Sequence, residues 1–412
     1  MSILGLLFVL MISSSSSDGE FVGRRGTEFV WNGSEFLFNG FNAYWMMQVA
    51  EEASQKHIVP AVFLEASRVA LGVCRIWAFS DGGDRALQKS PGVYDERFFQ
   101  ALDFVVAEAG KHNMKLIMSL INNYVTFGGR HQYVEWARSG GASLASDDDF
   151  YTHPLVKGYY KNNAKYAALE SPIQSYHPTW DYTIPSSRLN GVAYKDDPTI
   201  MAWELINEPR CEVDTSGQTI GRWIQEMGSY VKSIDNKHLV TVGMEGFYST
   251  PDRVQYNPKS LKYGTDFINN NLIPYVDFAT IHAYPAIWLA GESEKTQMEF
   301  LKRWLTIHWT DSKSILKKPL VFGEFGKSSK DPGFSIKQRD AFMTEVYASI
   351  YNLAKSGRTI AGGLVWQIGG EGMDSYFDGY EVVLTLNPST REIIRNQSNN
   401  MISLGQPYIK EI

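Results

Sequence analysis

Residues 200–210, which read IMAWELINEPR, decide how the rest of this chain is interpreted. Their front half is an apolar run that predicts a buried β-strand, and Pro209 ends that strand because proline lacks a ladder donor. Asn207 and Glu208 stand where the strand ends. A carboxylate at that place is costly to desolvate, so we expect Glu208 to have either a partner or a chemical role.

A second segment, residues 319–326 (PLVFGEFG), has the same pattern of an apolar run that ends in one carboxylate, Glu324. Two carboxyl groups, one acting as acid and one as nucleophile, can make a glycosidase pair. We therefore interpret the remaining sequence as the frame that brings Glu208 and Glu324 together.

The composition is that of a globular protein with a large core: 412 residues, 44% hydrophobic and 20% charged. The net charge of -6 and the lack of a basic tract give no reason to expect a nucleic-acid partner. Cys74 and Cys211 flank predicted strands, which favours buried free thiols over a disulfide. The sequence has no metal-ligand spacing, so we expect neither a metal nor a cofactor.

The N-terminus carries an apolar run at residues 3–12, followed by five serines. The run is too short to span a bilayer and is typical of a signal peptide, although no basic residue precedes it. We therefore predict a signal peptide at residues 1–17, a mature chain at 18–412, and no membrane anchor. Glycosylation sequons at Asn32 and Asn396 fit a secreted protein.

Eight short apolar segments predict β-strands, at residues 36–45, 73–79, 115–122, 200–210, 239–245, 278–284, 319–326 and 361–367. Helical spacing recurs between them, at residues 59–71, 98–111, 220–234, 298–309 and 339–356. This alternation predicts an α/β protein built as a single (β/α)8 TIM barrel, with long loops and its site at the carboxyl ends of the strands. A doubly wound open sheet is the alternative, but no Gly-rich nucleotide loop follows the first strand.

Polar and aromatic side chains recur at the ends of these strands. They are Arg75, Trp77, Asn122, Asn123, Asn207, Glu208, Glu245, His282, Tyr284, Glu324 and Trp366. Each alone has an ordinary explanation, since strand ends border solvent. As a set, they predict a ring of functional groups around one cleft.

Several motifs carry a family resemblance. Residues 203–209, 282–284 and 323–326, together with Trp366, resemble glycoside hydrolase family five. Residues 78–85, 194–200 and 243–248 are similar to its plant endo-β-1,4-mannanases. The resemblance runs from about residue 21 to the C-terminus.

The resemblance implies that Glu208 is the general acid/base and Glu324 the nucleophile of a retaining mechanism. It implies that Arg75 and Tyr284 orient the nucleophile and that His282 joins the polar network around it.

The same resemblance implies sugar contacts. Asn207 would hold the sugar 2-hydroxyl, and Trp366 would lie under the sugar at the reacting position. Trp77, Trp136 and Trp288 are candidate platforms further along the cleft, with loop packing as the alternative for each.

Two other carboxylates on predicted strands have supporting interpretations. We expect Glu204 to be buried against a cation and Glu245 to support the site.

The implied function is a secreted endo-hydrolase, extracellular or in the cell wall. Its substrates would be internal β-1,4-mannosidic bonds of mannan, glucomannan and galactomannan, with transglycosylation as a side reaction and no obligate protein partner. Two alternatives stay open: a β-1,4-glucanase of the same fold, and a carbohydrate-binding protein that has lost catalysis.

One segment departs from the family pattern. Residues 164–191 contain Pro172, Pro178 and Pro185 and are longer than the resemblance implies. Prolines break helices, so this segment is either a tolerated surface loop or an altered boundary that weakens the third outer helix. We expect the enzyme to remain active.

Overall fold

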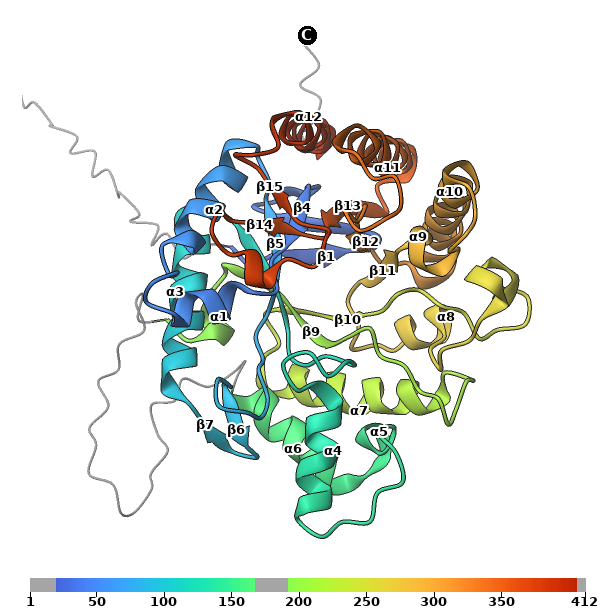
Figure 1. Cartoon of the computed structure of the whole chain (residues 1–412). Helices are drawn as coiled ribbons and strands as arrows, with labels where there is room; N and C mark the ends of the chain where they lie inside the picture. The colour runs from blue at the N-terminus through green and yellow to red at the C-terminus, as the bar shows by residue number, and fades with distance from the viewer. Residues whose placement is uncertain (1–19, 167–191, 406–412) are drawn as a thin grey trace, which may run out of the picture.

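Eight parallel strands form the centre of the molecule (Figure 1). The computed structural model describes residues 20–166 and 192–405. The strands are β4 (Gly40–Asn42), β5 (Val73–Trp77), β8 (Lys115–Ser119), β9 (Ile200–Asn207), β10 (Leu239–Gly243), β11 (Ala279–Ala283), β12 (Leu320–Phe325) and β13 (Ile360–Val365). They pair in the order β10-β9-β8-β5-β4-β13-β12-β11, and a bridge from Thr241 to Phe278 joins the two ends. The predicted barrel is confirmed, with one strand in each predicted segment.

The first strand is shorter than the sequence predicted. Residues 36–45 form a strand only at Gly40–Asn42, because Phe36 pairs with Phe29 at one end and helix α1 begins at Met46 on the other. The expected free thiols are confirmed, since Cys74 and Cys211 are buried and unbonded to each other.

Helices surround the strands (Figure 1). Those predicted by spacing are α2 (Ile58–Arg68), α3 (Glu96–Lys111), α7 (Gln218–Ile234), α10 (Glu294–Asp311) and α11 (Ile336–Gly357). The helices that spacing did not predict are α4 (Gly129–Ser139), α6 (Pro154–Ala164) and α12 (Pro388–Gly405), and the short α1 (Met46–Glu51), α5 (Asp149–Thr152), α8 (Phe267–Asn271) and α9 (Pro285–Trp288). Helix α7 shows why the helices cover the barrel: its buried side chains recur at positions 220, 223, 224, 227 and 231, one face of the helix.

A small antiparallel sheet closes the end of the barrel where the strands begin. It consists of β1 (Gly23–Arg25), β2 (Glu28–Trp31) and β3 (Ser34–Glu35). Phe29 on β2 is fully buried, and its ring lies 6.3 Å from that of Phe38 and 5.1 Å from that of Phe278. Because apolar rings seal this end, solvent reaches the strands at their carboxyl ends.

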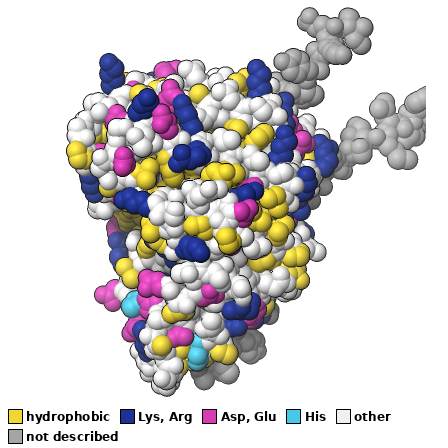
Figure 2. Space-filling model, turned by 90° about the vertical axis from the view of Figure 1, so that its right-hand side faces the viewer, with side chains coloured by type: hydrophobic (Ala, Val, Ile, Leu, Met, Phe, Trp, Pro, Cys, Tyr) yellow, Lys and Arg dark blue, Asp and Glu magenta, His cyan; other side chains and the backbone are white. Residues whose placement is uncertain are grey.

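The remaining short elements lie in loops. They are β6 (Gln88–Ser90), β7 (Val93–Tyr94), β14 (Ile368–Gly369), β15 (Val382–Val383), a π-helical turn at Ser312–Leu316, and 3-10 turns at Tyr194–Asp196, Val254–Tyr256, Pro258–Ser260 and Asp374–Tyr376. Figure 2 shows one face of the molecule, on the side of α10, where acidic and basic side chains are interspersed.

Two predictions fall on parts of the chain outside the described residues. The proposed signal peptide, residues 1–17, is one. The other is most of the departing segment, since α6 forms through Ala164 and residues 167–191 are not described. Within the described ranges, no helix combines the length and apolar character that a bilayer span requires.

Candidate active site

Glu208 lies at the carboxyl end of β9, where the strand stops. All eight residues of β9 are buried, and Pro209 prevents the ladder from continuing. The backbone of Glu208 has a φ of +48°, which is uncommon for a residue with a side chain. Its N–H donates to the carbonyl of Gly243 at 2.6 Å, so the neighbouring strand holds this strained turn in place.

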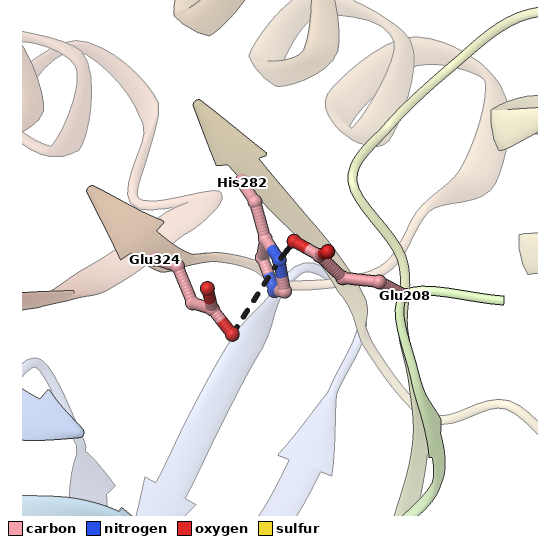
Figure 3. A group of neighbouring side chains, drawn as sticks. All are labelled: Glu208, His282 and Glu324. Carbon is pink, nitrogen blue, oxygen red and sulfur yellow. Dashed lines mark hydrogen bonds and ion pairs between the residues drawn. The ribbon is translucent and has the colours of Figure 1, made fainter. Parts of the chain in front are cut away.

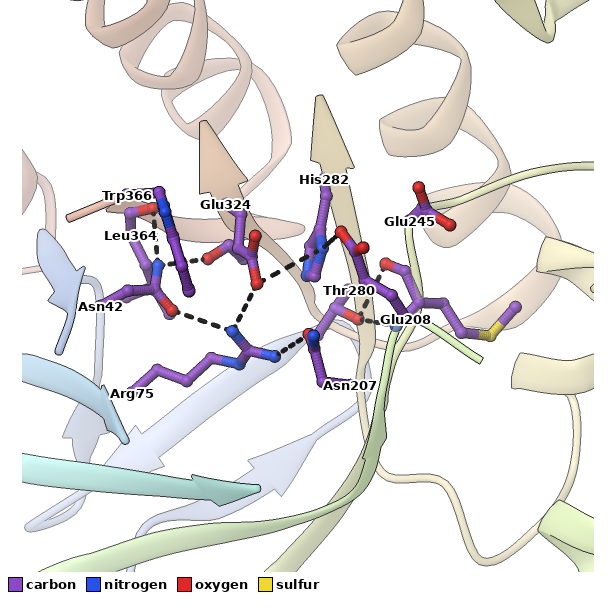
Figure 4. A network of polar contacts seen from close by, with 12 residues as sticks. Asn42, Arg75, Asn207, Glu208, Glu245, Thr280, His282, Glu324, Leu364 and Trp366 are labelled. Carbon is purple, nitrogen blue, oxygen red and sulfur yellow. Dashed lines mark hydrogen bonds and ion pairs between the residues drawn. The ribbon is translucent and has the colours of Figure 1, made fainter. Parts of the chain in front are cut away.

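Glu324 lies on β12 and is held by two donors, of which Figure 4 shows Arg75. Nη1 of Arg75 donates to Oε1 at 2.6 Å, and the hydroxyl of Tyr284 donates to Oε2 at 2.6 Å. The carboxylate is 3% exposed and Arg75 2% exposed, so water screens this ion pair weakly. Two charge-assisted hydrogen bonds therefore fix the direction in which Glu324 points.

His282 on β11 lies between the two carboxyl groups, as Figure 3 shows. Its Nδ1 is 2.7 Å from Oε1 of Glu208 and 3.6 Å from Oε1 of Glu324. Gly323 makes room for the ring, because a Cβ there would lie 3.0 Å from Nε2 of His282. Among the described residues, Nε2 has no hydrogen-bond partner.

The two carboxyl groups are close together. One oxygen of each, together with a ring nitrogen of His282, all lie within 4.8 Å of one another. In retaining glycosidases the two carboxyl groups are about 5–5.5 Å apart, whereas inverting enzymes keep about 6.5–9.5 Å. The spacing of Glu208 and Glu324 is that of a retaining pair. The same three groups are close enough to bind a metal ion, but the guanidinium of Arg75 already neutralises Glu324, which disfavours a second cation.

Arg75 is the centre of the buried polar network. It donates to Glu204 at 2.9 and 2.6 Å and to Oδ1 of Asn207 at 2.6 Å, in addition to Glu324. Glu204 is fully buried, and Ser119 donates to it at 2.6 Å. The expected pairing of Glu204 with a cation is confirmed. Because Arg75 is shared by Glu204, Asn207 and Glu324, it couples strands β5, β9 and β12.

Burial and neighbouring charges set the electrostatics of the pair. Burial raises the pKa of Glu208 above its ordinary value, and Arg210 and Tyr124 oppose the rise. Burial also raises the pKa of Glu324, while His282 and Arg75 oppose it. Burial lowers the pKa of His282, so its ring is neutral near neutral pH. Glu324 accepts directly from Arg75, and this contact favours its ionised form.

Glu245 is held by a partner that the sequence analysis did not single out. Nε and Nη2 of Arg210 donate to its two oxygens at 2.9 and 2.7 Å, and the guanidinium lies 4.1 Å from the ring of Tyr263. Burial and the charge of Glu208 raise the pKa of Glu245 to about 7. The bidentate pair fixes the direction in which the Glu245 carboxyl group points.

A cleft opens above the carboxyl pair. It is lined by Trp77, Asn122, Tyr124, Thr126, Asn207, Glu208, Arg210, Glu245, Tyr284, Ile287, Trp288, Glu324, Trp366 and Tyr380. Of the predicted site residues, Arg75, Asn123 and His282 are absent from this lining. Arg75 and His282 are 2% and 0% exposed and act on the carboxyl groups from below. Asn123 accepts from the backbone N–H of Arg210 at 3.2 Å. Trp288 lines the cleft, whereas Trp136 packs against Tyr133 with ring centroids 5.1 Å apart.

An aromatic wall forms one side of this cleft. The ring of Tyr44 stacks on Trp366 with centroids 5.6 Å apart and planes 7° apart, and it lies 5.0 Å from Trp77. The indole N–H of Trp366 donates to Asp378 at 2.7 Å. Flat apolar faces of this kind suit the apolar faces of sugar rings.

Comparison with known proteins agrees with this geometry. The family model described as GH family 5 beta-mannosidase-like matches residues 19–380. The chain belongs to glycoside hydrolase family 5. It is similar to mannan endo-1,4-beta-mannosidase 5 of Solanum lycopersicum, with 54% identity over 96% of this chain and 92% of the relative. Mannan endo-1,4-beta-mannosidase 7 of Arabidopsis thaliana is 48% identical over 96% of this chain and 88% of its own. The resemblance predicted from the sequence is confirmed.

Solved structures of the family share the fold. The endo-beta-1,4-mannanase from Thermotoga petrophila superposes with a TM-score of 0.75 and 31% identity, over 90% of this chain and 78% of its own. The endo-1,4-beta-mannanase from Rhizomucor miehei gives a TM-score of 0.76 and 26% identity, over 93% and 100%.

Several residues of this family 5 site were missed from the sequence. Arg210 follows the strand-ending Pro209 directly, so its position was a usable signal. Tyr44 lies in the first predicted strand segment and had no polar neighbour to mark it. Asp378 lies in a loop 12 residues beyond Trp366, and nothing in its sequence context links the two.

Proposed function

We propose that this protein is a retaining endo-hydrolase of β-1,4-linked mannan backbones. The observation that carries the proposal is the pair Glu208 and Glu324, with oxygens within 4.8 Å and different hydrogen-bond partners. The relatives' names support mannan as the polysaccharide. The cleft supports an extended substrate because Trp366 and Trp288 both line it together with the carboxyl pair.

In the first step, Glu324 attacks the anomeric carbon while Glu208 protonates the glycosidic oxygen that leaves. Arg75 and Tyr284 keep Glu324 ionised and aimed. Neutral His282 would donate from Nδ1 to Oε1 of Glu208, which leaves Oε2 to carry the transferred proton. The glycosyl-enzyme that results is an ester of Glu324.

In the second step, the roles reverse. Once Glu324 is esterified, its negative charge is gone and no longer raises the pKa of Glu208. Glu208 has given up its proton and now takes one from a water molecule, which attacks the anomeric carbon. A sugar hydroxyl in place of water would give transglycosylation.

Substrate contacts follow from the same geometry. We assign Trp366 as the platform under the sugar at the reacting position, and Trp77 as part of the aromatic wall beside it. Asn207 would hold the 2-hydroxyl, since its carboxamide is oriented by Arg75 at 2.6 Å and by Asn122 at 3.0 Å. We further propose that the chain is secreted to act on cell-wall mannan, on the basis of its N-terminal sequence.

The test measures reducing-end release and viscosity loss on unbranched mannan, glucomannan and soluble cellulose with the purified protein. The proposal expects mannan cleavage, with viscosity falling early because internal bonds are cut. Faster cleavage of cellulose than of mannan would favour the glucanase alternative. Binding of mannan without any cleavage, by a folded protein, would favour a carbohydrate-binding role and overturn the proposal.

A further inference from the structure

Residues 374–383, here called the platform strap, follow Trp366 and return to it. The strap begins with the 3-10 turn Asp374–Tyr376 and ends in β15, whose Val382 pairs with Ile368 on β14. Val382 also donates its N–H to the carbonyl of Gln367 at 2.8 Å. Backbone pairing therefore fixes the end of the strap beside Gln367, which directly follows Trp366.

The strap makes a polar contact with each of two stacked rings in the aromatic wall. Oδ2 of Asp378 accepts from the indole N–H of Trp366 at 2.7 Å. The carbonyl of Tyr376 accepts from the hydroxyl of Tyr44 at 2.8 Å. A third contact reaches the nucleophile's neighbour, since the ring of Tyr380 meets that of Tyr284 edge-on at 5.4 Å.

Asp378 is itself oriented, so it can orient the indole. Its Oδ1 accepts from the N–H of Tyr380 at 3.0 Å, which leaves Oδ2 facing Trp366. The torsion between an indole and its Cβ is soft, and stacking alone permits the ring to slide and turn in its own plane. A hydrogen bond at the indole nitrogen removes that freedom.

We propose that Asp378 is a positioning residue that fixes the plane and rotation of Trp366 beneath the reacting sugar. This inference rests on the proposed function, which gives Trp366 its role. The sugar ring changes shape on the way to the transition state, so the orientation of the platform matters more there than in the bound ground state. Loss of Asp378 should therefore lower kcat while the other cleft residues keep KM nearly constant.

The test is a double-mutant cycle on unbranched mannan oligosaccharides with Asp378→Ala and Trp366→Phe, since phenylalanine keeps a ring but lacks the donor. Asp378→Ala alone should lower kcat by about 10- to 100-fold, with KM changed by less than about 3-fold. In the Trp366→Phe background it should cause no further loss. Asp374→Ala is the matched control, because Asp374 is an exposed residue of the same strap. Its side chain makes no hydrogen bond or ion pair among the described residues.

An equal loss in both backgrounds, or wild-type kcat in Asp378→Ala, would overturn the inference. A second readout needs no turnover: indole N–H resonances of protein labelled at its 11 tryptophans, with Trp366 assigned by its absence in Trp366→Phe. Its proton should move upfield in Asp378→Ala and stay in place in Asp374→Ala. An unmoved signal would overturn the inference even if the wild type proved inactive on mannan, whereas inactivity alone would overturn only the proposed function.

Discussion

The surroundings of Glu324 and Glu208 differ although the two side chains are chemically identical. Glu324 accepts from a buried guanidinium and from a hydroxyl, so its anion is stabilised. Glu208 has neutral His282 and the hydroxyl of Tyr124 as neighbours, and the nearby Arg210 is already paired with Glu245. We propose that residues from other strands, rather than the sequence next to either glutamate, set the division of labour between nucleophile and acid.

The largest effect should come from Glu324→Ala, which removes the carboxylate that Arg75 and Tyr284 stabilise. Activity should fall by roughly 10⁴-fold or more on both mannan and aryl mannosides, because no covalent intermediate can form. Azide should restore turnover of the aryl mannoside by entering the vacated space. Glu299→Ala, an exposed glutamate on α10, is the control and should behave as wild type. Substantial hydrolysis by folded Glu324→Ala would contradict the assignment.

Glu208→Gln removes the proton donor and leaves the anion intact. We expect a loss of about 10²- to 10⁴-fold on mannan, the usual contribution of general acid catalysis. Aryl mannosides with a good leaving group need no protonation in the first step, so glycosyl-enzyme formation on them should be nearly unchanged. A rapid burst of aryl release followed by slow turnover would show this. Equal losses in both steps would count against the role as acid.

Tyr284→Phe weakens only the stabilisation of the anion. Loss of one hydrogen bond to a charged group costs about 1.5–3 kcal/mol, or roughly 10- to 100-fold in kcat/KM. The hydroxyl favours ionised Glu324 and so lowers its pKa, and its removal should raise that pKa. Since Glu324 must be ionised to attack, the acid limb of the pH–rate profile should move to higher pH. A shift of the alkaline limb instead would contradict the claim that the Tyr284 hydroxyl stabilises the anion of Glu324.

Glu245→Gln changes the acid's surroundings and should have the smallest effect. The charge of Glu245 faces Glu208, and its removal also leaves Arg210 unneutralised. Both changes lower the pKa of Glu208. Glu208 must be protonated to act, so activity is lost as pH rises through that pKa, and the alkaline limb should move to lower pH. An alkaline limb that stays in place or moves upward would show that Glu245 does not tune the acid.

The strands were predictable because each is a short apolar run bounded by polar residues, and parallel strands place their ends at one edge. That rule was enough to bring Glu208, His282 and Glu324 into one set from the sequence. Helices such as α4 and α6 were missed because their apolar spacing is weak: two of the five buried residues of α4 are Gly129 and Arg130, and α6 begins after His153 with a proline.

Contacts between side chains could not be predicted from the sequence. The sharing of Arg75 among four acceptors, with Asn42 at 3.0 Å as the fourth, depends on its being inside the barrel at the level of Glu204, which strand register decides. The bond between Asp378 and Trp366 depends on how a loop returns, which no periodic pattern encodes. Sequence patterns identified many of the groups at the site, and the structure adds Tyr44, Arg210 and Asp378 and shows which groups act on each other.

The most direct test of a retaining pair is the configuration of the newly formed reducing end. Mannan oligosaccharide is cleaved inside the NMR tube, and the anomeric proton is followed before mutarotation mixes the two forms. Carboxyl oxygens within 4.8 Å predict that the β-anomer appears first, with the α-anomer growing in slowly. Initial appearance of the α-anomer would mean inversion, and would contradict the assignment of Glu324 as a nucleophile.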